Sequence, residues 1–259
     1  MAERAGIHAQ ALGGGVDVFF TGARLDGVDD SNLAHHVPHV PDQLAAARHR
    51  VAELSGTDVE AWHLMRQVHG AGVGVIDGQV PRGAELRDVD VLVTTLVDRP
   101  LVVLAADCLP IVAAGRRAIA VAHAGWRGVV AGVSDALVDA LLGSGERSED
   151  VMVAIGPAIG PCCYAVGEDV RDAVATVEPG AVARTRDGRG SLDLRAAVRS
   201  RLHVRGVSDV VEVPGPSDEG SACTACDPRW FSHRRDARSG RHAGIIVRRG
   251  DTTVDRTAG

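Results

Sequence analysis

Apolar residues along the chain fall into short runs that Gly, Pro and Asp interrupt. This pattern predicts many short strands separated by turns. Residues 101–106 and 119–122 are apolar at successive positions, so both faces of these segments should be buried, and we expect them to be central strands. The strands that the pattern predicts are 16–20, 63–68, 73–76, 89–95, 101–106, 118–123, 151–155, 209–213 and 244–247.

Segments with helical spacing alternate with these strands. Pro41 stands at the start of the first and Gly56 just after its end, which is typical of helix termini. The Arg- and Gly-rich segment 180–190 is expected to be an exposed loop. The predicted helices are 41–54, 128–142, 168–177 and 191–204. We therefore predict one α/β domain over residues 1–259 with a mixed β-sheet and a frayed tail at 250–259.

Composition narrows the class of protein. Of 259 residues, 45% are hydrophobic, which is enough for a large core. The net charge is −6 and aromatic residues make up 3%, so a nucleic-acid partner is not expected. No apolar run approaches the ~20 residues that span a bilayer, and the first residues do not resemble a secretory signal. We expect no membrane partner and a cytoplasmic location.

The five cysteines do not form the even set of a disulfide framework. Cys162, Cys163, Cys223 and Cys226 could together supply four thiolates to a structural zinc ion. Adjacent cysteines are nevertheless a poor chelate in comparison with two spaced pairs. We therefore expect these four to be buried thiols. The histidines at 35, 36 and 39 form a polar loop cluster that is not expected to be a site.

Three residues that commonly bind metals, His69, Cys108 and His123, stand where predicted strands end. Cys108 follows His69 by 39 residues, and His123 follows Cys108 by 15, so neither pair has a local chelate spacing. The argument therefore rests on their positions at the ends of strands. Side chains at strand ends converge in α/β folds. One thiolate and two imidazoles would give zinc three ligands and leave a fourth position open to water or substrate. A metal-free Cys108–His123 nucleophile pair and purely structural roles are the alternatives.

Seven segments, in order along most of the chain, are similar to motifs of the YfiH/YlmD family. This family is also called the polyphenol oxidase or laccase-domain family, and it is associated with purine nucleoside phosphorylase activity. The segments are 20–22 (FTG), 32–33 (NL), 66–70 (RQVHG), 106–110 (ADCLP), 123–128 (HAGWRG), 155–164 (IGPAIGPCCY) and 231–236 (FSHRRD).

The resemblance implies a compact mixed α/β sandwich and a catalytic zinc ion bound by His69, Cys108 and His123. The implied reactions are phosphorolysis of adenosine, inosine, guanosine and methylthioadenosine, and hydrolytic deamination of adenosine. An older assignment for the family is copper-dependent oxidation of phenols, and some members resemble hydrolases that edit wrongly built peptidoglycan precursors. The chain has His233 and His49 where the family usually has Tyr and Asn.

Residues near these motifs are candidates for substrate binding. Arg127 or Arg66 could hold phosphate, although Arg66 and His69 would point to opposite faces of a continuous strand. Asn32 could contact a ribose or base, or cap a turn. Trp126 could stack on a purine or anchor the core. Asp107 is a weak acid–base candidate because it should point away from Cys108.

Composition disfavours a multicopper oxidase. None of the 11 histidines forms a His-x-His pair and no cysteine has a neighbouring histidine, whereas such an oxidase needs many paired histidines. The resemblance implies the remaining prediction, a zinc-dependent purine nucleoside phosphorylase with adenosine deaminase activity, for which the partners are a small purine nucleoside and phosphate. The alternatives are an amide hydrolase acting on a UDP-muramyl-serine precursor, a copper polyphenol oxidase, and a non-enzymatic scaffold.

Overall fold

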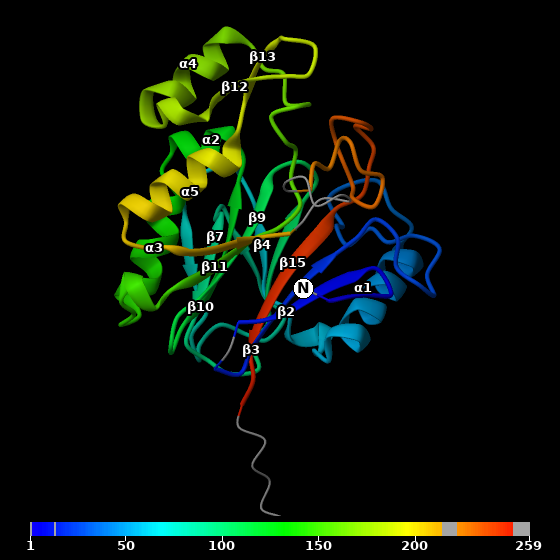
Figure 1. Ribbon diagram of the computed structural model, residues 1–259. Helices are drawn as coiled ribbons and strands as arrows, with labels where there is room; N and C mark the ends of the chain where they lie inside the picture. The colour runs from blue at the N-terminus through cyan, green and yellow to red at the C-terminus, as the bar shows by residue number, and fades with distance from the viewer. Residues whose placement is uncertain (1, 13, 214–221, 251–259) are drawn as a thin grey trace, which may run out of the picture.

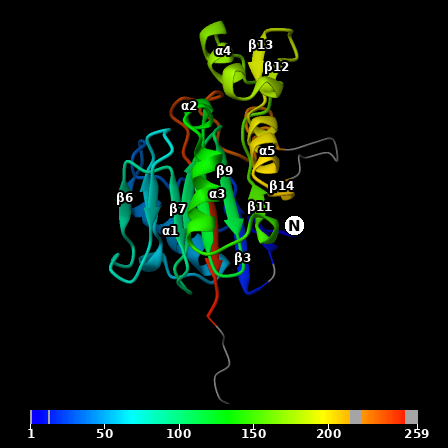
Figure 2. The same cartoon turned by 90° about the vertical axis from the view of Figure 1, so that its left-hand side faces the viewer.

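Two β-sheets packed face to face form the centre of the structure, and helices cover their outer faces (Figures 1 and 2). The computed structural model describes residues 2–12, 14–213 and 222–250. The strands are β1 (Ala2–Arg4), β2 (Ile7–Ala11), β3 (Val16–Thr21), β4 (Leu64–Arg66), β5 (Val73–Val75), β6 (Glu85–Arg87), β7 (Val91–Thr94), β8 (Leu101–Ala105), β9 (Leu109–Ala114), β10 (Ile119–Ala124), β11 (Met152–Ile155), β12 (Val182–Arg184), β13 (Gly190–Leu192), β14 (Asp209–Glu212) and β15 (His242–Arg248).

The first large sheet has the order β1-β2-β3-β15-β8 with antiparallel neighbours. The second has the order β14-β11-β9-β10-β7-β5 and is mixed, because β14 pairs with β11, and β5 with β7, in parallel. The pairs β4–β6 and β12–β13 form small separate sheets. The predicted mixed α/β class is therefore confirmed, with the strands divided between two main sheets rather than one.

The helices are α1 (Pro41–Ser55), α2 (Trp126–Val130), α3 (Val133–Gly143), α4 (Glu168–Val177) and α5 (Leu194–Val204), with short 3-10 turns at Val59–Ala61, Ser148–Asp150 and Pro179–Ala181. Helix α1 lies on the outer side of the five-stranded sheet, and α3 and α5 lie on the outer side of the six-stranded sheet (Figures 1 and 2). None of the described helices has the length and apolar character needed to span a bilayer.

Alternation along the strands sorts the core into three layers. In β10, Ile119 and Val121 face the five-stranded sheet, whereas Ala120 and Ala122 face the helices α3 and α5. A third cluster packs the other face of the five-stranded sheet against α1, with Val51 among its members. Both faces of each sheet are therefore buried, which explains why the central strands are apolar at successive positions.

Several sequence predictions need correction. Strand β8 ends its sheet instead of lying at the centre, although it is fully buried. The predicted helix 128–142 is two helices that meet at Gly132, whose φ of 84° breaks the helical backbone. Segment 180–190 is not a simple loop, because β12 pairs there with β13.

The sequence prediction missed β1, β2, β6, β9, β12 and β13. Strand β9 was missed because Pro110, which is unusual inside a sheet, stands near its start. The predicted frayed tail lies outside the described residues except for Gly250, whose amide donates to Asp98 Oδ1 at 3.4 Å.

Candidate metal centre

Three potential metal ligands, His69, Cys108 and His123, come together at one end of the sandwich. Their ligand atoms all lie within 4.8 Å of one another. Cys108 Sγ is 3.8 Å from His69 Nε2, and the rings of His69 and His123 lie nearly perpendicular with centroids 4.7 Å apart. The structure thus brings together the three residues that the sequence singled out.

Each ligand is placed by a break or an end in regular structure. Cys108 lies in the bend between β8 and β9, where the chain passes from one large sheet to the other and Asp107 has a φ of 88°. The side chain of His123 lies on the same face of β10 as that of Val121. His69 follows β4 with a φ of 61°, a left-handed conformation that turns the chain sharply.

Gly125 keeps the space beside the ligands open. A Cβ at this position would come within 2.9 Å of His69 Cδ2 and 3.0 Å of Cys108 Sγ. Any other residue would therefore push on two of the three candidate ligands. This close approach gives a physical reason for the glycine in the His-Ala-Gly-Trp segment.

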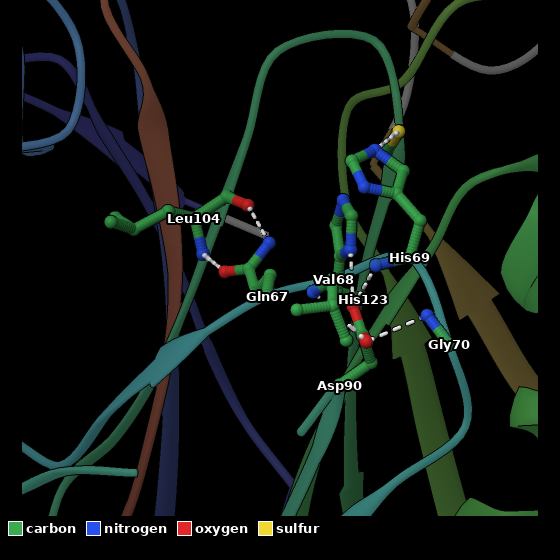
Figure 3. A network of polar contacts seen from close by, with 8 residues as sticks. Gln67, Val68, His69, Gly70, Asp90, Leu104 and His123 are labelled. Carbon is green, nitrogen blue, oxygen red and sulfur yellow. Dashed lines mark hydrogen bonds and ion pairs between the residues drawn. The ribbon is translucent and has the colours of Figure 1, made fainter. Parts of the chain in front are cut away.

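The buried carboxylate of Asp90 organises two of the ligands (Figure 3). Its Oδ1 accepts hydrogen bonds from the His69 amide at 3.0 Å and from His123 Nδ1 at 2.9 Å. Its Oδ2 accepts from the amides of Val68 and Gly70 at 3.2 and 2.7 Å. With Nδ1 of His123 engaged in this way, Nε2 is the ring nitrogen left for a metal.

Gln67 holds the His69 loop to the neighbouring strand (Figure 3). Its side-chain Nε2 donates to the carbonyl of Leu104 at 2.8 Å, and its Oε1 accepts from the amide of Leu104 at 3.0 Å. This pair of bonds imitates the pairing of two strands. Two sets of hydrogen bonds therefore hold the loop. Gln67 binds the backbone of Leu104, and Asp90 accepts the amides of Val68, His69 and Gly70.

Electrostatics favour a charged form for Asp90 and for the pair Cys108–His123. Burial alone would raise the pKa of Asp90, but the hydrogen bonds from His123 and from the backbone of Gly70 and Val68 outweigh burial and lower it. Burial would lower the pKa of His123, yet the Cys108 thiolate and Asp90 raise it to about 9. Without metal, these opposite shifts favour a thiolate on Cys108 and an imidazolium on His123.

In metal-free protein, we expect Cys108 to be alkylated rapidly at neutral pH. Burial acts to raise the pKa of its thiol, but His123 and His69 outweigh burial and lower the pKa to about 6. The thiolate fraction, and with it the alkylation rate, therefore rises as the pH increases through about 6. Mass spectrometry of the Cys108 peptide after iodoacetamide treatment measures this profile. A midpoint near the ~8.5 of a free cysteine would contradict it.

The ligands open into a cavity of about 750 Å³, a size typical of small-molecule sites. Five arginines line it, against the two acidic residues Glu85 and Asp107, although the chain as a whole has a charge of −6. The arginines are Arg66, Arg87, Arg127, Arg234 and Arg241. The cavity is therefore locally basic and suited to an anion.

Two of these arginines were predicted from the sequence, and the structure places both in the cavity wall. Arg127 lies in α2, where its guanidinium stacks 4.3 Å from the centroid of the Trp126 ring. The argument that disfavoured Arg66 was wrong, because β4 ends at Arg66 and the chain turns before His69. The alternation of a continuous strand therefore does not apply to this pair.

Asn32 does not line the cavity. Its side chain donates to the carbonyl of Ala34 at 2.9 Å and accepts from the amides of Ala34 and Arg241 at 3.0 and 2.9 Å. These bonds fit the alternative that Asn32 caps a turn. The bond from the Arg241 amide also holds the backbone of Arg241, which lines the cavity. Trp126 and Tyr164 do line the cavity, as do His35 and His36, which were not expected to belong to a site.

Both carboxylate oxygens of Asp107 are engaged. Thr224 Oγ1 donates to Oδ1, and the Arg234 amide donates to Oδ2, each at 2.6 Å. These two bonds join the bend before Cys108 to the segments that carry Thr224 and Arg234. The arrangement favours a structural role for Asp107 over acid–base chemistry.

Sequence reasoning missed Asp90, which accepts four hydrogen bonds from the segments that carry His69 and His123. The available signal was a single carboxylate within the apolar segment 89–95, which is costly to bury without partners. Tyr164, Arg87, Arg234 and Arg241 were also missed as cavity residues. They come from segments that only the fold brings together.

Comparison with known proteins identifies the family. The family model described as "Multi-copper polyphenol oxidoreductase laccase" matches residues 19–249. A purine nucleoside phosphorylase of Mycobacterium tuberculosis is 36% identical over 220 residues, covering 84% of each chain. One of Xylella fastidiosa is 38% identical over 231 residues, covering 86% of this chain and 85% of that one.

Solved structures share the whole fold. The crystal structure of YlmD from Geobacillus stearothermophilus has a TM-score of 0.85 and 29% identity, covering 96% of this chain and 98% of that one. The hypothetical protein YfiH of Bacillus licheniformis has a TM-score of 0.84 and 25% identity, covering 95% and 97%. The resemblance to YfiH and YlmD is thus confirmed, and the chain belongs to the family described as multi-copper polyphenol oxidoreductase laccase.

Proposed function

We propose that the protein is a zinc-dependent purine nucleoside phosphorylase that cleaves adenosine, inosine, guanosine and methylthioadenosine and also deaminates adenosine. The observation that carries this proposal is the His69–Cys108–His123 cluster in the wall of an arginine-lined cavity. Relatives at 36–38% identity that are named purine nucleoside phosphorylases support it.

The donor set fits a catalytic zinc ion. Zinc binds thiolate at ~2.3 Å and imidazole at ~2.0–2.1 Å, so tetrahedral neighbours lie about 3.3–3.8 Å apart. The 3.8 Å between Cys108 Sγ and His69 Nε2 is close to that spacing. When bound, zinc supplies a Lewis acid that polarises a substrate oxygen or acidifies water.

The set of metal-binding groups argues against several copper ions. Within the described ranges, two groups of side chains could hold a metal, and His69–Cys108–His123 is the one that contains histidine. A multicopper oxidase needs further clusters of paired histidines. The geometry therefore supports a single metal ion at this site rather than a cluster of copper ions.

The arginines suit phosphate. Arg66 and Arg87 occupy partner positions in the β4–β6 pair, and two like charges side by side are unfavourable unless an anion neutralises them. Neither forms an ion pair with a carboxylate in the described part of the chain, and the same holds for Arg127. Their guanidinium groups are thus available to bind phosphate in the planar, two-pronged manner typical of arginine.

Aromatic side chains in the cavity suit a purine. Trp126 and Tyr164 both line the cavity, and the Tyr164 ring centroid lies 5.3 Å from the Arg234 guanidinium. Burial, and then the charge on Cys108, raise the pKa of Tyr164 to about 12. Its hydroxyl therefore keeps its proton at neutral pH and can donate a hydrogen bond to a base or ribose oxygen.

In the proposed phosphorolysis, the arginines hold phosphate so that one of its oxygens forms a bond to ribose C1′. The glycosidic bond to the purine breaks at the same carbon, and the base leaves with the bonding electron pair. The leaving purine takes up the proton that phosphate loses. The other product is ribose 1-phosphate from adenosine, inosine or guanosine, and methylthioribose 1-phosphate from methylthioadenosine. Positioning of two reactants in one cavity is the main contribution of the chain's own residues.

We expect Arg127→Ala to weaken phosphate binding. Loss of a charge-assisted contact worth about 1.5–3 kcal/mol should raise the KM for phosphate ~10–100-fold, with a smaller effect on the KM for nucleoside. Arg117→Ala, in the exposed turn between β9 and β10, is the matched control and should change neither constant. Equal rises in both KM values for Arg127→Ala would contradict the phosphate role.

A product assay tests the proposed function as a whole. Purified protein is incubated with each nucleoside, with and without inorganic phosphate, and in parallel with a UDP-muramyl-serine precursor. We expect the base and the corresponding sugar 1-phosphate to form only when phosphate is present, and inosine to form from adenosine in its absence. Release of serine with no nucleoside turnover would instead identify an amide hydrolase and overturn the proposal.

A further inference from the structure

The remaining four cysteines of the chain form a second cluster. Cys163 Sγ lies 3.2 Å and Cys162 Sγ 3.7 Å from Cys226 Sγ, and all four sulfur atoms, including that of Cys223, lie within 4.8 Å of one another. The expectation of buried thiols was wrong for three of them. Cys223 is buried, Cys162 and Cys163 are partly exposed, and Cys226 is exposed.

We propose that Cys162, Cys163, Cys223 and Cys226 bind a structural zinc ion with four thiolates. Tetrahedral zinc–sulfur coordination at ~2.3 Å places sulfur atoms about 3.8 Å apart, close to the observed separations. The cluster is distinct from the candidate catalytic site, because the two sets of ligands share no residue.

Local backbone structure explains how adjacent cysteines serve one ion. Residues 161–163 form a turn in which the amides of Cys163 and Tyr164 both donate to the carbonyl of Gly160, at 3.0 and 3.1 Å. In such a turn, neighbouring side chains are not forced to opposite sides as they are in a strand. The objection that adjacent cysteines chelate poorly therefore does not apply to this conformation.

The second pair has the spacing typical of zinc ligands. Cys223 and Cys226 are separated by two residues, and the Cys226 amide donates to the Cys223 carbonyl at 3.1 Å, which closes a tight turn. The Gly160 amide donates to Cys223 Sγ at 3.2 Å, a contact that stabilises a thiolate. A Cβ at Gly160 would lie 3.3 Å from Cys162 Sγ, so a residue without a side chain suits this position.

Two arginine side chains place positive charge beside the cluster. Arg186 and Arg195 lie near enough to interact with the cluster electrostatically and would offset the negative charge of a four-thiolate zinc site.

The proposed zinc ion would hold the wall of the catalytic cavity in place. Tyr164, which lines the cavity, directly follows Cys163. Thr224, which directly follows Cys223, donates to Asp107 in the bend that carries Cys108. An ion between the turns at 161–163 and 223–226 thus fastens together two segments that shape the catalytic site.

Metal analysis of the full chain separates the two sites. We expect about two zinc ions per chain in the wild type, about one in Cys108→Ala, and about one in the double variant Cys163→Ser/Cys226→Ser. Both serine positions are at least partly exposed, so neither substitution buries an unpaired hydroxyl. The double variant should also unfold at lower temperature, while Cys108→Ala should lose turnover instead.

Cys108→Ala offers a second readout that needs no change in the cluster. Its four remaining cysteines are all cluster residues, so thiolate-to-metal charge-transfer absorption after loading with cobalt(II) reports on the cluster alone. A strong band that reaches its plateau at one equivalent is expected. Absence of zinc from Cys108→Ala, iron in its place, or an intact mass lower by two hydrogens, which shows a disulfide, would overturn the proposal. If Cys108→Ala binds as much zinc as the wild type does, the result would instead count against zinc binding at the catalytic site.

Discussion

Cys108→Ala is expected to abolish nucleoside turnover and to remove one zinc ion from the chain. The substitution deletes the single thiolate among the three proposed catalytic ligands and leaves His69 and His123 as a pair. Two imidazoles alone bind zinc far more weakly than three ligands do. Turnover of adenosine and inosine should fall to the level of the assay without protein, and metal analysis should show the loss of one equivalent.

A double variant in the four-cysteine cluster is the direct control for Cys108→Ala. Cys163→Ser/Cys226→Ser should also lose one equivalent of zinc while keeping measurable turnover, because its changes lie outside the catalytic ligands. Circular dichroism checks that both proteins keep the fold. Full activity of Cys108→Ala would refute the zinc mechanism, whatever its metal content.

Asp90→Asn should weaken zinc binding at the catalytic site by ~10–100-fold. Both oxygens of Asp90 accept two hydrogen bonds each, from His69 and His123 on one side and from Val68 and Gly70 on the other. An asparagine offers one acceptor oxygen, and its NH₂ group would face N–H donors. The substitution therefore disturbs the orientation of His123 or the loop of His69, and we also expect a loss of about 1–3 kcal/mol in stability.

Titration with a competing chelator measures the affinity, and Asp77→Asn is a matched control. Asp77 also accepts backbone N–H bonds, from Gln79 and Val80, but it is exposed and remote from the ligands. Its substitution should leave zinc affinity unchanged. An Asp90→Asn protein that binds zinc as tightly as the wild type would show that the carboxylate does not support the site.

Most of the central strands and all three ligands of the candidate catalytic site could be predicted from the sequence, because each has a local signal. The apolar runs at β3, β8, β10 and β11 were recognised within one or two residues. Whether a buried strand is central or terminal has no local signal, which is why β8 was misplaced. Gly132 carries the break between α2 and α3, but a glycine inside a helical pattern is also compatible with a continuous helix.

The contacts around the ligands could not be predicted, because they depend on how distant segments pack. Asp90 reaches His123 across 33 positions of the chain, and Thr224 reaches Asp107 across 117. The four-cysteine cluster was dismissed because adjacent cysteines are a poor chelate in comparison with two spaced pairs. The turn at 161–163, which has no clear sequence signal, removes this objection. The motifs identified individual residues in the sequence, but only the fold shows which of these residues contact one another.

The most direct measurement is the anomalous scattering of zinc in crystals of the metal-loaded protein, collected on both sides of the zinc absorption edge. The account predicts a peak bounded by Cys108 Sγ at ~2.3 Å and by His69 Nε2 and His123 Nε2 at ~2.0–2.1 Å. An anomalous map of fully loaded, active protein with no peak among these three side chains would contradict it.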